Sequence, residues 1–101
     1  MTDLIPAIAK RLREQYAAKE IILYGSYAKG EETADSDIDI LVISDTKERF
    51  HERQATVKRL LRGLKNKVAV SPIVLTPSEL DGRLRMNDAF IKEIMDTGVR
   101  A

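Results

Sequence analysis

The chain has 101 residues and 44% hydrophobic content, which is enough for one buried core but not for a second. We therefore expect one domain over residues 1–101. The absence of cysteine excludes disulfide scaffolds, cysteine nucleophiles and thiolate zinc sites, and a single histidine, His51, argues against other zinc sites.

The net charge is only +1, but basic residues cluster between residues 47 and 67, where eight bases accompany two acids. Such a segment is typical either of a solvated helix face or of a contact with nucleic acid. We favour the solvated face, because no aromatic residues alternate with the bases. Nucleic acid is therefore not expected as a partner, although a regulator that binds DNA through this segment remains an alternative.

The first element in chain order is a predicted helix. Thr2 is a candidate N-cap, Pro6 lies in the first turn, and apolar residues then recur at helical spacing: Ile5, Ile8, Ala9, Leu12 and Tyr16. Charged residues interrupt this segment, so it lacks the apolar run of a signal peptide or a membrane span. We expect a cytoplasmic protein with no membrane partner.

Three short apolar segments predict strands at residues 20–24, 37–43 and 68–75. Pro72 cannot donate a hydrogen bond to a neighbouring strand, which indicates a sheet edge or a bulge at that position. The connection over residues 25–37 is short for a parallel crossover that carries a full helix. The sequence therefore predicts an α+β fold, with a small mixed sheet of about three strands covered by helices.

Further helices are predicted after the second and third strands. Asp45 and Glu48 have the spacing of a capping box, and an apolar stripe follows it: Phe50, Val57, Leu60, Leu61 and Leu64. Gly63 or Asn66 is expected to end this helix. Helical sequence resumes after the turn at residues 76–78, and a last helix at residues 89–95 stops near Gly98. Its apolar stripe (Phe90, Ile91, Ile94 and Met95) either closes the core or forms a partner surface.

The segment at residues 23–30 reads as a strand, a glycine turn and the start of a helix. Gly25 allows the backbone to approach a phosphate, and the Ser26 hydroxyl and the free N–H groups of the helix start can point at its oxygens. Alone, such a junction is more often ordinary turn chemistry. Lys29 adds either a phosphate contact or a solvated charge. Tyr24 and Tyr27 flank the loop and either can stack on a base; we expect Tyr27 to be the more exposed.

Asp37 and Asp39 are two residues apart on a predicted strand, so both side chains lie on one face. Two carboxylates this close repel each other unless a cation neutralises them, and Mg²⁺ prefers oxygen ligands of this kind. The alternative is an exposed strand face on which both are solvated. Leu41 and Ile43 share that face and argue against the alternative. We therefore predict that Asp37 and Asp39 bind a divalent metal ion.

Gly25-Ser26, Gly30 in the loop, and Asp37-x-Asp39 after ten intervening residues together resemble the signature of the DNA polymerase β-like nucleotidyltransferase superfamily, in its minimal nucleotidyltransferase (MNT) branch. The resemblance covers nearly the whole chain and implies the polymerase β-like fold. It implies that Gly25 and Ser26, with Lys29 and Gly30 as further candidates, bind the triphosphate of ATP. It also implies that Asp37 and Asp39 hold Mg²⁺, which orients the α-phosphate for attack by a hydroxyl.

Catalytic members of this superfamily carry a third carboxylate on the next strand, about five residues before a Thr-Pro turn. Counting back from Thr76 reaches Ser71, and no acid occurs between residues 68 and 75. A serine cannot serve as a carboxylate base near neutral pH. The metal site is therefore expected to be incomplete, and Ser71 marks the third-carboxylate position.

The resemblance also implies a partner. Stand-alone MNT proteins pair with helical HEPN-family proteins in toxin–antitoxin systems, where the MNT member is the antitoxin and in some cases transfers AMP to a tyrosine of the toxin. The expected function is a magnesium-dependent transfer of AMP from ATP to a hydroxyl of such a partner. The alternative is a catalytically degenerate MNT domain that binds nucleotide weakly or not at all and neutralises its partner by contact.

Overall fold

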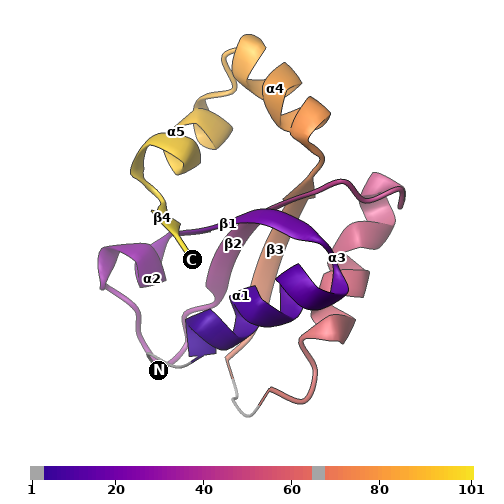
Figure 1. The fold of residues 1–101 in the computed structure, drawn as a ribbon. Helices are drawn as coiled ribbons and strands as arrows, with labels where there is room; N and C mark the ends of the chain where they lie inside the picture. Colours follow the sequence, from indigo (N-terminus) through magenta and orange to yellow (C-terminus); the bar gives the residue numbers. More distant parts are fainter. Residues whose placement is uncertain (1–3, 65–67) are drawn as a thin grey trace.

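The computed structural model describes residues 4–64 and 68–101, which form helices and strands in alternation (Figure 1). The helices are α1 (Leu4–Gln15), α2 (Ser26–Lys29), α3 (Phe50–Leu60), α4 (Pro77–Arg85) and α5 (Ala89–Thr97). The strands are β1 (Ala18–Tyr24), β2 (Ile38–Ser44), β3 (Val70–Leu75) and β4 (Val99–Arg100). None of the described helices is long and apolar enough to cross a membrane.

The strands form one mixed sheet in the order β3-β2-β1-β4. β1 is antiparallel to β2 and to β4, whereas β2 and β3 are parallel and are connected through α3. The predicted α+β fold with a mixed sheet is confirmed, and β3 lies at the edge where Pro72 is tolerated. β4 was not predicted, because a strand of two residues is too short to show the alternation of apolar and polar residues that indicates a strand.

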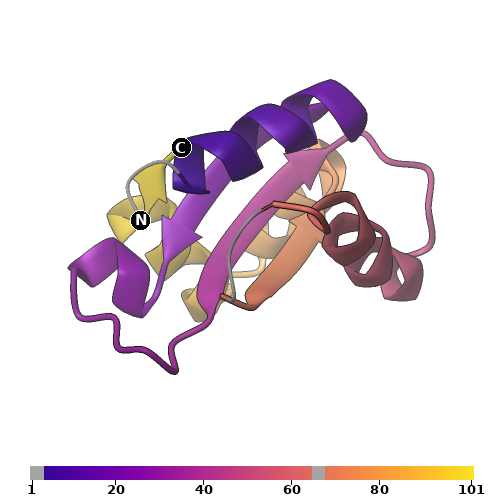
Figure 2. The same cartoon turned by 90° about the horizontal axis from the view of Figure 1, so that it is seen from below.

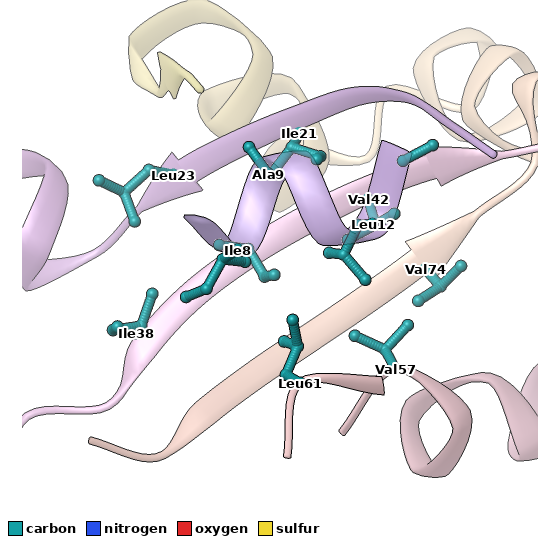
Figure 3. Close-up of a cluster of buried hydrophobic side chains, with 12 residues drawn as sticks. Ile8, Ala9, Leu12, Ile21, Leu23, Ile38, Val42, Val57, Leu61 and Val74 are labelled. Carbon is teal, nitrogen blue, oxygen red and sulfur yellow. The ribbon is translucent and has the colours of Figure 1, made fainter. Parts of the chain in front are cut away.

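Helices cover both faces of the sheet: α1 and α3 lie on one face, and α4 and α5 lie on the other (Figures 1 and 2). The first face buries a cluster from α1, α3 and three strands that includes Leu12, Val42 and Val57 (Figure 3). The second face buries a smaller cluster that includes Leu41, Ile91 and Ile94. Both sides of the sheet are therefore apolar, and alternate residues of β2 enter the two clusters as its period of two predicts.

The helix after β2 differs from the prediction at its start. It begins at Phe50 with Arg49 as N-cap, and the Glu52 carboxylate accepts a hydrogen bond from the Arg49 backbone N–H at 3.2 Å. The capping box at Asp45 is wrong, because Glu48 instead accepts hydrogen bonds from Tyr16 (2.7 Å) and Thr56 (2.5 Å).

Phe50 does not belong to the core as predicted, since half of the residue surface is exposed. The last helix extends to Thr97, two residues further than predicted, and Gly98 caps it, which confirms the predicted stop. The predicted roles of Thr2 and Asn66 concern residues outside the described ranges.

Candidate active site

Gly25 connects β1 to the single turn of α2 and has φ 74° and ψ −153°, a backbone conformation that is essentially restricted to glycine. No side chain caps α2, so its first N–H groups have no side-chain acceptor. Gly30 ends α2 in a left-handed conformation at φ 69°. The predicted strand, glycine turn and helix start are confirmed.

The pairing of β1 with β2 brings the two predicted halves of the site together. Tyr24 and Asp39 are cross-strand partners, so the Asp39 carboxylate lies directly over the start of the glycine turn. A Cβ atom on Gly25 would lie only 2.5 Å from Asp39 Oδ2. The absence of a side chain at Gly25 therefore makes room for the carboxylate, in addition to permitting the turn.

Asp37 and Asp39 differ in their surroundings. Asp37 is exposed just before β2, whereas Asp39 is half-buried within the strand. Partial burial, and then the nearby negative charge of Asp37, raise the pKa of Asp39 above its ordinary value. Carboxylate oxygens are the kind of ligand that suits Mg²⁺, so the two side chains are candidates for binding it. Across the described residues, no three His, Asp or Glu side chains gather into a metal-binding group.

Ser71 is the parallel-strand partner of Asp39, on the edge strand β3. Residues paired in this way project from the same face of the sheet, so an exposed Ser71 side chain shares the face of Asp39. This placement agrees with the expectation that position 71 lies on the same side of the sheet as Asp39. That Ser71 stands in place of a carboxylate remains a prediction.

The two tyrosines beside the loop pack against different hydrophobic clusters. Both are partly buried, and Tyr27 packs against the α1 side of the core. Tyr24 packs against the opposite core, and burial followed by the charge of Asp39 raises its pKa to about 12. Its hydroxyl thus stays protonated at neutral pH and can donate a hydrogen bond.

A cavity of about 240 Å³ opens beside the loop, between β1, α2 and α5. Tyr24, Gly25 and Lys29 line one side, and α5 supplies the other side with Phe90, Glu93, Ile94 and Thr97. The sequence reading did not connect α5 with the site. Its residues lie about sixty positions after the loop, and no motif links them to it.

Comparison with known proteins decides the family. A family model described as "Nucleotidyltransferase domain" matches residues 5–99. The chain belongs to the nucleotidyltransferase domain family. The structure of this nucleotidyltransferase domain also matches the crystal structure of a putative nucleotidyltransferase from Sulfolobus solfataricus, with a TM-score of 0.59 and 29% sequence identity over 81% of this chain and 72% of that one.

Several curated relatives carry a more specific name. "Putative protein adenylyltransferase MJ0141" of Methanocaldococcus jannaschii is 31% identical over 78% of this domain and 74% of that protein. "Protein adenylyltransferase MntA" of Thermococcus cleftensis is 49% identical over 40% of each chain. "Putative protein adenylyltransferase MJ1379" of M. jannaschii is 56% identical over 36% of each, so this match spans about a third of that relative's length.

Proposed function

We propose that this domain transfers AMP from ATP to a hydroxyl group of a partner protein in the cytoplasm. The observation that carries the proposal is the Asp39 carboxylate packed against Gly25, with Asp37 beside it. This arrangement joins a phosphate-binding turn to a pair of metal-binding oxygens at one end of the sheet. The relatives named as protein adenylyltransferases support AMP as the transferred group and a protein as its acceptor.

In this proposal each part of the site has one task. Gly25 and Ser26 hold the phosphates, with Lys29 and Gly30 as further contacts. Asp37 and Asp39 hold Mg²⁺, which when bound stabilises the charge that develops on the transferred phosphate. The acceptor oxygen bonds to the α-phosphorus, the bond to the bridging oxygen of the β-phosphate breaks, and pyrophosphate leaves with the electron pair. The hydroxyl proton passes to solvent, because β3 presents Ser71 and no carboxylate, so transfer should be slow.

For the partner, the resemblance to MNT proteins suggests a HEPN-family toxin, with this domain as the antitoxin. The neighbouring open reading frame offers a simple check. A small helical protein with an Arg-x₄-His motif supports this partner, and an unrelated neighbour argues against it.

The site itself is tested by replacing both carboxylates, Asp37→Asn together with Asp39→Asn. Calorimetry should show magnesium-dependent ATP binding weakened roughly tenfold or more, because charged contacts to the cation are lost. Equal affinity of both proteins for ATP with magnesium would refute the metal site.

The same pair of proteins gives a second readout from thermal unfolding. The pKa of Asp39 is raised in the folded state, so its ionised form lowers stability once the pH exceeds that value. Without metal at neutral pH, the double variant should therefore unfold at the same or a higher temperature than the wild type. The difference in unfolding temperature between the double variant and the wild type should shrink as the pH falls through the raised pKa of Asp39. A double variant with an unfolding temperature well below that of the wild type at neutral pH would show that the two carboxylates stabilise the fold.

A second candidate function is neutralisation of the partner by contact alone, with a degenerate nucleotide site. The metal donor set of two carboxylates and the serine at position 71 favour it. Labelled ATP, magnesium and the partner distinguish the two functions. Label on the partner supports the transferase, whereas a stable inhibited complex without label supports neutralisation by binding.

A further inference from the structure

The cavity between β1, α2 and α5 is the right size for part of a nucleotide. Cavities that enclose a complete drug-sized ligand measure roughly 300–1,000 Å³. A volume of about 240 Å³ therefore suits a flat ring system better than a whole nucleotide. Gly25 and Lys29 belong to both the phosphate loop and the cavity wall, so a ligand with phosphates at the loop has its remaining part beside this cavity.

Two of the side chains that line the cavity are aromatic. Tyr24 and Phe90 meet edge to face, with ring centroids 5.7 Å apart and ring planes at 86°. Tyr24 is partly buried and positions the pair, while Phe90 is 52% exposed although it lies in the first turn of α5. An exposed phenylalanine ring that lines a cavity and packs against a second ring provides a surface on which a planar base can stack.

The α5 side of the cavity offers hydrogen-bond acceptors. The Glu93 side chain is exposed and forms no ion pair with any residue in the described ranges. The Thr97 hydroxyl donates to the Glu93 backbone carbonyl at 2.8 Å, which leaves its oxygen lone pairs as acceptors. Two acceptors on neighbouring turns of one helix match a ligand group with two N–H donors, such as an amino group on a ring.

We infer that this cavity binds the nucleobase of the substrate and selects a base with an exocyclic amino group, such as adenine. Phe90 stacks on the base, Glu93 and Thr97 accept hydrogen bonds from the amino group, and the loop at Gly25 holds the phosphates. This inference rests on the proposed function for the phosphate end of the site. It adds α5, at the opposite end of the chain, as the element that determines specificity.

The stacking is tested with Phe90→Ala, using ATP and inorganic tripolyphosphate as probes in calorimetry with magnesium. ATP affinity should fall about tenfold, whereas tripolyphosphate affinity should stay unchanged because it has no base to stack. Lys92→Ala is the matched control, since Lys92 is an exposed neighbour on α5 that does not line the cavity. An equal loss of affinity for ATP and tripolyphosphate in Phe90→Ala, or no loss of affinity for ATP, would overturn the inference.

The selection is tested with Glu93→Ala, using ATP and inosine triphosphate, which carries an oxygen in place of the amino group. The wild type should prefer ATP by roughly threefold to tenfold, and the variant should lose this preference. A wild type without preference, or a preference that survives in Glu93→Ala, would overturn the selection. Both substitutions replace exposed side chains, and thermal unfolding verifies that the variants are folded.

The two proposals fail in different ways. If ATP binding depends on Asp37 and Asp39 but Phe90→Ala and Glu93→Ala change nothing, the inference is wrong and the proposed function stands. If the wild type binds neither ATP nor tripolyphosphate, both are wrong.

Discussion

Gly25 has two separate reasons to be glycine. Its φ of 74° with ψ of −153° disfavours any side chain, and a Cβ atom would clash with the Asp39 carboxylate. Gly25→Ala should therefore destabilise the fold by about 2 kcal/mol and displace the carboxylate, so that nucleotide binding also weakens.

Gly63→Ala is the control for this prediction. Gly63 has a similar positive φ of 89°, but a Cβ there would meet nothing within 4 Å. Gly63→Ala should lower the free energy of unfolding by about 1 kcal/mol and leave ATP affinity unchanged. Urea unfolding and calorimetry measure the two effects, and an unaltered ATP affinity in Gly25→Ala would contradict the close packing of the turn on Asp39.

Ser71 is the second residue with a specific expectation. It is exposed on an edge strand and shares a face with Asp39, so an aspartate can be introduced without disturbing the core. Ser71→Asp should speed AMP transfer to the partner, by ~10²-fold if the new carboxylate acts as a well-placed base. Transfer of label from ATP to the partner protein measures the rate.

Ser71→Asn is the matched control, since it adds bulk and polarity but no charge or base. It should not accelerate transfer. Strong labelling by the wild type that Ser71→Asp leaves unchanged or reduces would show that a third carboxylate is unimportant at this position. Without metal, Ser71→Asp should also be less stable than Ser71→Asn, because it adds a third negative charge.

At the scale of elements, Arg53 connects helices on opposite faces of the sheet. Only 5% of this residue is exposed, although it lies in the segment rich in basic residues. Its guanidinium donates to the Glu48 and Val74 carbonyls, each at 3.1 Å, and to both Glu79 oxygens at 2.6 and 3.2 Å. Glu79 also accepts from the Thr76 backbone N–H at 2.8 Å and so completes the capping box of α4.

Glu79→Gln should therefore destabilise the domain by about 2 kcal/mol, less than the ~3–5 kcal/mol of a fully buried pair because Glu79 is 39% exposed. Adding Arg53→Met should recover part of this loss, since no unpaired charge remains buried. The hydrogen bond from Arg53 lowers the pKa of Glu79 in the folded state. The contribution of ionised Glu79 to stability is therefore present above the pKa that Glu79 has in the unfolded chain, and it is lost as the pH falls through the lower pKa of the folded state.

Urea unfolding of the single and double variants measures the coupling between Arg53 and Glu79. Asp81→Asn is the control, because the Asp81–Arg85 pair on α4 is exposed and should contribute less than about 0.5 kcal/mol. If the losses in free energy of unfolding for Arg53→Met and Glu79→Gln simply add in the double variant, the two residues are not coupled and the connection between α3 and α4 through them is refuted.

The elements could be predicted where a local pattern determined them. The apolar periodicities of α1 and β2, and the Thr76-Pro77 turn before α4, led to the observed structures. The start of α3 was wrong because two acids three residues apart suggested a cap, whereas tertiary contacts take Glu48 to Tyr16 and Thr56. The burial of Arg53 had no sequence signal, since its partners lie on other elements.

At the scale of the whole molecule, the site lies where three strands meet at one end of the sheet. β1 ends there, while β2 and β3 begin there, because β1 is antiparallel to β2 and β2 is parallel to β3. Gly25, Asp39 and Ser71 come together for this reason. The α5 helix reaches the same end from the second face of the sheet.

The sequence by itself determined the local chemistry of this protein: the glycine turn, the two carboxylates two residues apart at the start of one strand, and the serine five positions before a Thr-Pro turn. These features depend on spacing within one segment of the chain. Such spacing can be interpreted from local backbone geometry alone, namely the two-residue period of a strand and the conformations open to glycine. Only the tertiary structure decided which segments meet. It packed Asp39 against Gly25, paired it with Ser71, and brought Phe90 and Glu93 close to the loop at Gly25. Strand pairing and helix packing join residues far apart in the chain, and no local pattern records those contacts.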